Sequence, residues 1–222
     1  MDISRHREVV NPYEYTQPIH IIGCGATGSW VGLILAKMGF SNIVIYDFDM
    51  VEEHNIPNQN YTISDIGCTK ISALHKSMKL NNPDIDVNMH ESKVDSSYVF
   101  TGIVFCLVDS MESRKEIWHN CIKNKIKVDL FIETRMGAEQ GMVYTINPKN
   151  YNEARLYEQT LLYTDDMAET SLCGTSISVL PTAMSVASQA VWQLISHLIG
   201  SEYDSEVMVN YMDNEIFAQK FQ

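Results

Sequence analysis

Short runs of apolar residues alternate along the chain with longer stretches in which apolar positions recur every three or four residues. The short runs predict strands over 19–22, 42–46, 86–89, 102–108, 127–132 and 141–146. The amphipathic stretches predict helices over 29–37, 68–80 and 114–123. Because strands and helices alternate, the pattern indicates an α/β fold with a mostly parallel sheet.

The first 17 residues and the region after residue 146 depart from this alternation. Residues 1–17 are mostly polar and predict an N-terminal arm. Residues 147–177 show no strong period, and we interpret them as a crossover loop, since structureless segments of that length are usually functional or mobile. A long apolar helix is predicted from Pro181 to about Ile199, followed by an edge strand over 207–211.

Composition narrows the class of protein further. The 222 residues suit one domain over 1–222, and 45% apolar with 20% charged residues is typical of a globular chain. The formal charge of −12 disfavours nucleic acid as a partner, because binding to phosphate backbones needs clustered Lys and Arg. No apolar stretch reaches the roughly 20 residues that a membrane span needs, so no membrane association is expected.

Cysteine and histidine usage argues against metal-stabilised or disulfide-linked folds. The five cysteines are odd in number and none are spaced C-x-x-C, so we expect no disulfide framework and no structural zinc. The seven histidines form no spacing typical of a metal site. Without a signal-peptide pattern at the start, these features predict a cytoplasmic location.

A glycine-rich turn provides the first sign of chemistry. Gly23, Gly25 and Gly28 follow the first strand and open the first helix, in the pattern G-x-G-x-x-G. Such a turn lets phosphate approach backbone N–H groups at a helix N-terminus. Asp47 ends the second strand, where an acid accepts hydrogen bonds from ribose hydroxyls. These residues predict a nucleotide without saying which one, and they would suffice for an NAD-dependent oxidoreductase.

Three further motifs distinguish the alternatives. The first is the run Asp47-Phe48-Asp49-Met50-Val51-Glu52-Glu53-His54-Asn55-Ile56-Pro57-Asn58-Gln59. The second is Asp65-Ile66-Gly67-Cys68-Thr69-Lys70, and the third is Asp109 at the end of a strand with Arg114 after it. Their order and spacing resemble the ThiF/MoeB/ubiquitin-activating superfamily over about residues 5 to 146. This resemblance implies a Rossmann-like sheet with helices on both faces that continues into antiparallel strands and a crossing loop.

The resemblance also implies roles for individual residues. Asp47 would hold the ribose, and Asn55 and Lys70 would contact the triphosphate, with Lys70 neutralising charge in the transition state. Asp109 would hold Mg²⁺. Asp49, Asn58 and Gln59 would complete the nucleotide-binding set, with Gln59 orienting the nucleotide or its loop. Arg114 is expected to be structural.

One position departs from the family pattern. Residue 58 is asparagine where the family usually has an arginine that reaches the phosphates, and an amide cannot supply that positive charge. The segment around Arg5 resembles the arginine-bearing arm that, in dimeric members, reaches the nucleotide of the partner subunit. Arg5 would therefore imply a homodimer, although a disordered basic tail is the alternative.

Cys173 lies at the end of the predicted crossover loop. Several members of the family use a cysteine there to take the acyl group from the adenylate. An incidental thiol remains open, because the sequence identifies no neighbouring base.

The combined pattern favours an ATP-dependent adenylyltransferase of the minimal type. Its expected substrate is a carboxylate, most often the C-terminal glycine of a small ubiquitin-like or sulfur-carrier protein or a peptide. Two alternatives stay open. A catalytically impaired nucleotide-binding partner would fit Asn58, and an NAD-dependent oxidoreductase would fit the glycine turn but leave Lys70 and Asp109 unexplained.

Overall fold

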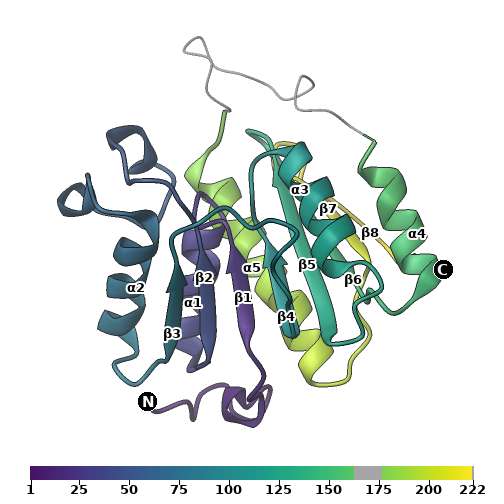
Figure 1. Cartoon of the computed structure of the whole chain (residues 1–222), viewed down its shortest axis with the longest axis horizontal. Coiled ribbons are helices and arrows are strands. Elements are labelled where there is room, and N and C mark those ends of the chain that lie inside the picture. The colour runs from purple at the N-terminus through teal and green to yellow at the C-terminus, as the bar shows by residue number, and fades with distance from the viewer. Residues whose placement is uncertain (163–176, 222) are drawn as a thin grey trace.

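The computed structural model describes residues 1–162 and 177–221. Eight strands of this part of the chain form one continuous sheet (Figure 1). The strand order is β3-β2-β1-β4-β5-β6-β7-β8. The strands are β1 (Ile19–Ile22), β2 (Ile43–Tyr46), β3 (Val87–His90), β4 (Gly102–Cys106), β5 (Val128–Met136), β6 (Gln140–Ile146), β7 (Glu206–Asn210) and β8 (Glu215–Gln219). The predicted α/β architecture is therefore confirmed.

The sheet changes character at β5. Strands β1 to β5 pair in parallel, whereas β6, β7 and β8 join as antiparallel strands. The strand order reverses at β1, which lies between β2 and β4. In open α/β sheets, ligands bind in the crevice outside the carboxyl ends of the strands at such a switch point.

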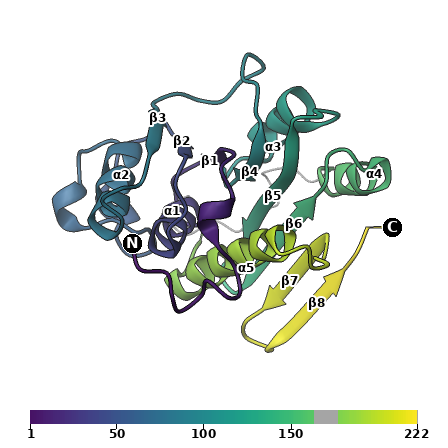
Figure 2. The ribbon, with the colours of Figure 1, turned by 90° about the horizontal axis from the view of Figure 1, so that it is seen from below.

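Helices cover both faces of the sheet, as Figures 1 and 2 show. They are α1 (Gly28–Met38), α2 (Lys70–Asn81), α3 (Met111–Ile117), α4 (Tyr151–Thr160) and α5 (Leu180–Leu198). The first, second and fifth pack on one face, and the third and fourth on the other. Among the described residues, no helix is long and apolar enough to cross a bilayer.

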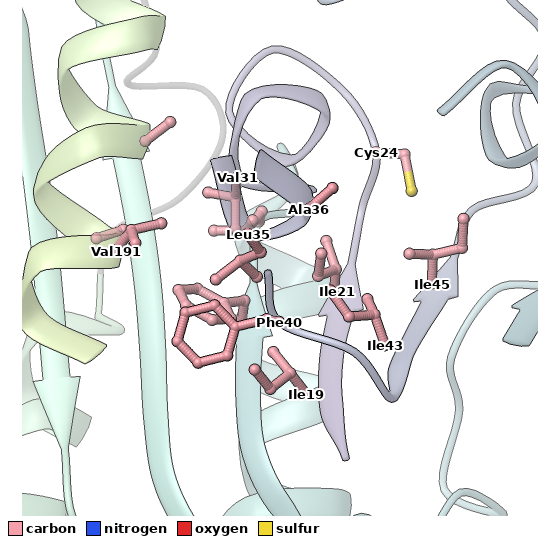
Figure 3. Close-up of a cluster of buried hydrophobic side chains, with 14 of the residues drawn as sticks. Ile19, Ile21, Cys24, Val31, Leu35, Ala36, Phe40, Ile43, Ile45 and Val191 are labelled. Atoms are coloured by element: carbon pink, nitrogen blue, oxygen red, sulfur yellow. The ribbon is translucent and has the colours of Figure 1, made fainter. Parts of the chain in front are cut away.

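Fully buried aliphatic and aromatic side chains fill the layer under α1 and α5 (Figure 3). Val31 and Leu35 of α1 meet Ile21 of β1 and Val191 of α5 in this layer. These positions recur every three or four residues in the helix and every two in the strand, so the sequence pattern locates the face that each element buries. α1 ends at Gly39, whose φ of 92° forms a left-handed cap.

The predicted crossover loop over 147–177 does not begin as a loop. α4 occupies Tyr151–Thr160 within it and packs on the sheet through Ala154 and Tyr157, which are buried. The Asn150 side chain accepts hydrogen bonds from the backbone N–H groups of Asn152 and Glu153, which starts the helix. Most residues of this helix are polar, and for that reason the sequence analysis did not separate it from the loop.

The C-terminal region also differs from its prediction. β7 is flanked by β6 and β8, so the strand expected at the edge is an inner one. β8 is the edge, and every residue in it is exposed. The predicted helix over 114–123 is divided into α3 and a π-helical segment, Trp118–Ile122. The predicted strand over 127–132 continues to Met136.

The N-terminal arm packs against the end of α1. Ile3 and Val10 are buried, and the ring Nε2 of His6 lies 2.9 Å from the carbonyl oxygen of Met38. The arm therefore lies at the amino ends of the parallel strands, opposite to their carboxyl ends.

Candidate active site

A cavity of about 1530 Å³ opens at the carboxyl ends of the parallel strands and extends over β5 and β6. The predicted site residues that line it are Gly23, Gly25, Asp47, Asp49, Asn55, Asn58, Gln59, Lys70 and Asp109. Residues scattered over 87 positions of sequence thus meet at the switch point. Gly28 does not line the cavity, and its role lies in the backbone of the turn.

The three glycines of the turn have different functions. A Cβ at Gly28 would lie 1.9 Å from the carbonyl oxygen of Gly23, so the turn closes only with glycine there. Gly23 has a φ of 92°, and a Cβ there would lie 2.7 Å from the carbonyl oxygen of Leu107. A Cβ at Gly25 would meet nothing within 4 Å. Only Gly25 therefore leaves open space in the cavity, where a phosphate could approach the backbone.

The N-terminus of α1 is left open toward the cavity. Thr27, the N-cap residue, makes no side-chain hydrogen bond to the helix, whereas Thr69 and Ser110 cap α2 and α3 with theirs. The Thr27 hydroxyl instead accepts a hydrogen bond from the hydroxyl of Thr134 in β5, at 3.2 Å. Unsatisfied N–H groups and the helix dipole favour an anion at this end of α1.

Asp47 holds the glycine turn against the loop after β2. Its Oδ2 accepts a hydrogen bond from the backbone N–H of Cys24 at 2.6 Å, and its Oδ1 accepts one from Asp49 at 2.8 Å. Burial raises the pKa of the Asp47 carboxyl, while the two backbone hydrogen bonds oppose that rise. Each oxygen keeps a further lone pair, which is the acceptor capacity that a ribose hydroxyl needs.

Lys70 begins α2, and its side chain crosses the cavity wall to Asp49. The Lys70 Nζ lies 2.6 Å from Asp49 Oδ2, and the backbone N–H of Lys70 donates to the Asp49 carbonyl at 2.9 Å. The lysine side chain is 10% exposed and the aspartate side chain 49% exposed. The ammonium group is thus fixed by a neighbour that is itself open to solvent.

The loop after β2 contributes three amides. Asn55 is buried, and its Oδ1 accepts a hydrogen bond from the backbone N–H of Glu52 at 2.9 Å. The Nδ2 of Asn58 donates a hydrogen bond to the Ser178 hydroxyl. The backbone carbonyl of Asn58 accepts one from the Trp30 indole N–H at 3.2 Å. Position 58 therefore links this loop to the segment before α5 instead of presenting a charge to the cavity.

Two buried oxygens in this loop have no partner among the described residues, namely Asn58 Oδ1 and Gln59 Oε1. Buried polar atoms are nearly always hydrogen-bonded, so unpaired ones that line a cavity suggest donors supplied by a ligand. Adenosine and ribose carry such donors.

Asp109 follows β4 and is exposed on the cavity wall. The described residues contain no cluster of three or more His, Cys, Asp or Glu that could hold a metal ion by itself. Mg²⁺ commonly binds through one or two carboxylates, substrate phosphates and water, so a single exposed aspartate suits that ion. No zinc-type ligand set appears in the described part of the chain.

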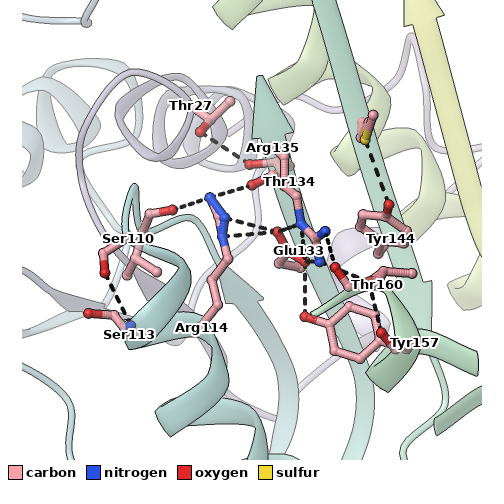
Figure 4. A network of polar contacts seen from close by, with 12 residues as sticks. Thr27, Ser110, Ser113, Arg114, Glu133, Thr134, Arg135, Tyr144, Tyr157 and Thr160 are labelled. Carbon is pink, nitrogen blue, oxygen red and sulfur yellow. Dashed lines mark hydrogen bonds and ion pairs between the residues drawn. The ribbon is translucent and has the colours of Figure 1, made fainter. Parts of the chain in front are cut away.

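A buried charge network that the sequence analysis did not predict borders the cavity (Figure 4). Glu133 is fully buried between two guanidinium groups, with Arg114 Nε at 3.1 Å and Arg135 Nη2 at 2.9 Å from its oxygens. Burial alone would raise the pKa of Glu133, but the two arginines hold it below its ordinary value. Arg114 also lines the cavity, and its guanidinium donates further hydrogen bonds to the carbonyl oxygens of Val108 and Thr134, so its expected structural role stays a prediction.

Arg135 extends this network to α4. It donates hydrogen bonds to the carbonyl and hydroxyl oxygens of Thr160 at 2.8 and 2.9 Å, and its guanidinium lies 4.5 Å from the centroid of the Tyr144 ring. The Tyr157 hydroxyl donates to Glu133 at 2.9 Å. The signal in the sequence was the pair of opposite charges inside an apolar strand, at positions two residues apart and hence on one face.

One predicted residue lies elsewhere, and another cannot be placed. Arg5 is exposed on the N-terminal arm and does not line the cavity. Cys173 lies outside the described residues, so its proposed role stays a prediction.

These features describe an α/β protein with a Rossmann-like sheet and a polar cavity at its switch point. The model of the ThiF family matches residues 16–222. The chain therefore belongs to the ThiF family.

Similar proteins place it among several kinds of relative. It is 25% identical over 131 residues to ubiquitin-like modifier-activating enzyme 5 of Caenorhabditis briggsae, covering 51% of this chain and 30% of that protein. It is 30% identical over 117 residues to the tRNA threonylcarbamoyladenosine dehydratase of Haemophilus influenzae, covering 50% and 45%. It is 28% identical over 146 residues to a probable molybdopterin-synthase adenylyltransferase of Gracilaria tenuistipitata var. liui, covering 63% and 39%.

A structure of E. coli MccB shares the fold, with a TM-score of 0.76 and 16% identity over 93% of this chain and 62% of that one. The matches span less than half of each relative in sequence.

Proposed function

We propose that this protein binds MgATP at the switch point and adenylates a carboxylate, releasing pyrophosphate. The observation that carries the proposal is the convergence of Gly25, Asp47 and the Lys70–Asp49 ion pair on one cavity beside the open N-terminus of α1. The family and a relative named as an adenylyltransferase support this reaction class.

In the proposed reaction, a carboxylate oxygen attacks the α-phosphorus of ATP. A new P–O bond forms, the bond to the bridging oxygen of the β-phosphate breaks, and pyrophosphate leaves with that electron pair. No proton must be transferred, so the protein contributes alignment and neutralisation of charge.

The residues of the cavity divide these tasks. Asp47 orients the ribose, and Lys70 moves its ammonium group from Asp49 toward the phosphates. The N-terminus of α1 receives phosphate oxygens. Asp109 would hold Mg²⁺, which supplies charge neutralisation for the triphosphate when bound.

The substrate class is a finer proposal. The cavity extends from the nucleotide region over β5 and β6, where Met136, Met142 and Leu156 line it. A chain terminus with a free carboxylate can enter such an extended cavity. The C-terminal glycine of a ubiquitin-like or sulfur-carrier protein, or of a peptide, is therefore the proposed acyl donor, in keeping with the name of one relative.

The nucleotide site is proposed to be composite. Every Lys and Arg that lines the cavity within the described residues is ion-paired, and position 58, where the family usually has a phosphate-binding arginine, is asparagine here. Arg5 of a second copy is the proposed replacement. Cys173 is the proposed acceptor of the acyl group, as the family resemblance implies.

The proposal is tested by magnesium-dependent ATP–pyrophosphate exchange with a panel of glycine-terminated carrier proteins and peptides. Lys70→Met should lower exchange at least a hundredfold, because the transition state loses a positive charge. Lys76→Met is the matched control. Lys76 is also a residue of α2 and forms an ion pair with an aspartate, Asp65, but it does not line the cavity. Asp109→Asn should likewise lower pyrophosphate exchange, and Asp84→Asn is its control, because Asp84 is exposed and does not line the cavity.

The outcomes separate the candidate functions. Exchange that disappears in Lys70→Met and Asp109→Asn but persists in both controls supports adenylation. ATP binding without exchange for any acid of the panel favours the catalytically impaired binding partner, for which Asn58 is the motivating observation. Binding of NAD in place of ATP would overturn the proposal.

A further inference from the structure

Arg114, Glu133 and Arg135 form a buried cluster in which two guanidinium groups share one carboxylate (Figure 4). The exposed fractions of the three side chains are 6%, 0% and 14%, in that order. The two arginines hold the pKa of Glu133 below its ordinary value, so its carboxylate is ionised. Among the described residues, neither guanidinium forms an ion pair with any other acidic side chain. The cluster therefore carries an excess of one positive charge.

This excess charge has an electrostatic cost. A buried charge without a counter-charge destabilises a fold, because the protein replaces only part of the hydration that the ion loses. The chain as a whole has a formal charge of −12, so most of its surface repels anions. A bound anion with a single negative charge would balance the cluster and remove that cost.

Each guanidinium of the cluster also retains a hydrogen-bond donor. Arg135 donates from Nε and Nη2 to Glu133, and from Nη2 and Nη1 to the two oxygens of Thr160. Arg114 donates from Nη1 to Glu133 and from Nη2 to two backbone carbonyl groups. Because each Nη1 carries two hydrogens, one N–H of each arginine has no acceptor among the described residues.

The cluster lies level with the carboxyl ends of the parallel strands. Cys106, the last residue of β4, pairs with Glu133 on one side and with Ile22 on the other. The glycine turn begins at the residue after Ile22. Arg114 and Arg135 both line the cavity. The excess charge is therefore beside the place where the triphosphate is proposed to bind.

We propose that this cluster binds the carboxylate of the acyl donor, with Arg135 as its main ligand. The inference rests on the proposed function and assigns a position within the cavity to the reacting group. A carboxylate brings one negative charge, which equals the excess, and its two oxygens match the planar donors of a guanidinium. Arg135 is the more exposed of the two arginines, and it borders the part of the cavity over β5 and β6.

In this arrangement the two carboxylate oxygens have different tasks. Arg135 holds one of them. The other forms the new bond to the α-phosphorus of ATP, and pyrophosphate leaves with the electron pair of the broken bond. The pyrophosphate group itself carries several negative charges and would overcompensate a single positive charge, so the charge balance favours the carboxylate as the ligand of the cluster.

The smallest probe of such a site is N-acetylglycine, which places a free carboxylate after one glycine. Its neutral counterpart is N-acetylglycinamide. Ligand-observed NMR titrations of the whole chain without nucleotide measure both dissociation constants. The native chain should bind the acid at least tenfold more tightly than the amide, because only the acid brings the balancing charge. Equal affinities would overturn the inference without any variant.

Substitutions then locate the binding. Arg135→Met should raise the dissociation constant of N-acetylglycine at least tenfold. Arg155→Met is the matched control and should keep the native value, because Arg155 lies on α4 but is exposed and does not line the cavity. Arg135→Lys keeps the charge balance that the fold requires but loses the planar donors, so it should bind severalfold more weakly. Native affinity in both Arg135 variants, with native circular dichroism, would overturn the inference.

Inorganic pyrophosphate separates a carboxylate site from a phosphate site. Its dissociation constant should change less than twofold in Arg135→Met, and a tenfold rise would assign the cluster to the leaving group and overturn the inference. None of these titrations uses ATP. A chain that prefers the acid but shows no pyrophosphate exchange counts against adenylation only. A chain that exchanges pyrophosphate but binds acid and amide equally counts against the carboxylate site only.

Discussion

The side-chain amide of Asn58 donates a hydrogen bond to the hydroxyl of Ser178, a residue 120 positions away. The contact links the loop after β2 to the segment that leads into α5. Asn58 stands where the family pattern has a phosphate-binding arginine. Its side chain joins two segments of the cavity wall and supplies no positive charge to the cavity.

This link should behave as a coupled pair in a double-mutant cycle. Asn58→Ala and Ser178→Ala should each lower the free energy of unfolding by about 1 kcal/mol, because a side-chain hydrogen bond is lost. The double variant should cost less than the sum, with a coupling of about 0.5–1.5 kcal/mol in urea unfolding. Strict additivity would contradict a direct interaction.

Restoring the arginine should strengthen nucleotide binding. Asn58→Arg should lower the dissociation constant of ATP about tenfold, because a guanidinium–phosphate hydrogen bond contributes about 1.5 kcal/mol. Asn58→Gln keeps an amide of similar length and should leave the affinity near the native value. Isothermal titration calorimetry measures both, and equal affinities would show that the phosphates lie away from position 58.

The glycines of the turn form a matched pair for separating binding from folding. Gly25→Ala should fold with a stability within about 1 kcal/mol of the native chain, since its Cβ meets no atom within 4 Å, yet should weaken ATP binding at least tenfold. Gly28→Ala should lose more than about 3 kcal/mol of stability, because its Cβ would lie 1.9 Å from the Gly23 carbonyl oxygen. Unchanged ATP affinity in Gly25→Ala would place the phosphates elsewhere.

Glu133 pairs with both Arg114 and Arg135, so removing Glu133 should lower the free energy of unfolding more than removing one arginine. Glu133→Gln leaves two guanidinium groups buried without a carboxylate and should destabilise the fold by about 3 to 5 kcal/mol. Arg135→Met leaves Arg114 and Glu133 as a balanced pair, so its cost should be clearly smaller. Urea unfolding at pH 7 compares them. A larger loss for Arg135→Met would show that its bonds to Thr160 matter more than the charge balance.

His20 should contribute to acid sensitivity. It is 7% exposed, its Nδ1 lies 3.0 Å from the Tyr46 hydroxyl, and burial lowers the pKa of its imidazole to about 4. Because the folded-state pKa lies below the unfolded value of about 6.5, the unfolded chain binds the proton first as the pH falls. Stability is therefore complete above pH 6.5 and declines toward pH 4.

Between pH 7.5 and pH 5 this group should account for about 2 kcal/mol of lost stability. His20→Gln removes the titration and should show a correspondingly flatter profile when urea unfolding is repeated across that range. His75→Gln, on α2 and only partly buried, serves as the control and should keep the native slope. A native slope in His20→Gln would assign the acid sensitivity to other groups.

The parallel half of the fold follows closely from the sequence, and the remainder does not. The glycine turn, the mainly apolar β1 and the periodic α1 are elements whose local sequence pattern agrees with their burial in the structure. α4 and β8 have few buried residues, so they depend on the sheet already being present. The network around Glu133 depends on pairing between β5, α3 and α4, which no local pattern specifies.

The site shows the same division. Asp47 was predicted from its place after the second strand, and Asp49 and Lys70 from the resemblance to the ThiF/MoeB/ubiquitin-activating superfamily. The structure brings all three to one cavity. That Lys70 pairs with Asp49, or that Asn58 contacts Ser178, could not be predicted, because each contact depends on how separate loops pack.

The alternating faces of β5 have a consequence for how the protein can vary. Glu133 and Arg135 point to α4 while Thr134, between them, reaches Thr27 in the glycine turn. Deleting or inserting one residue earlier in the strand would exchange the two faces and bury the charges under α1. Related chains should therefore differ in length before Val128 or beyond Ile146, and β5 itself should keep a constant number of residues through evolution.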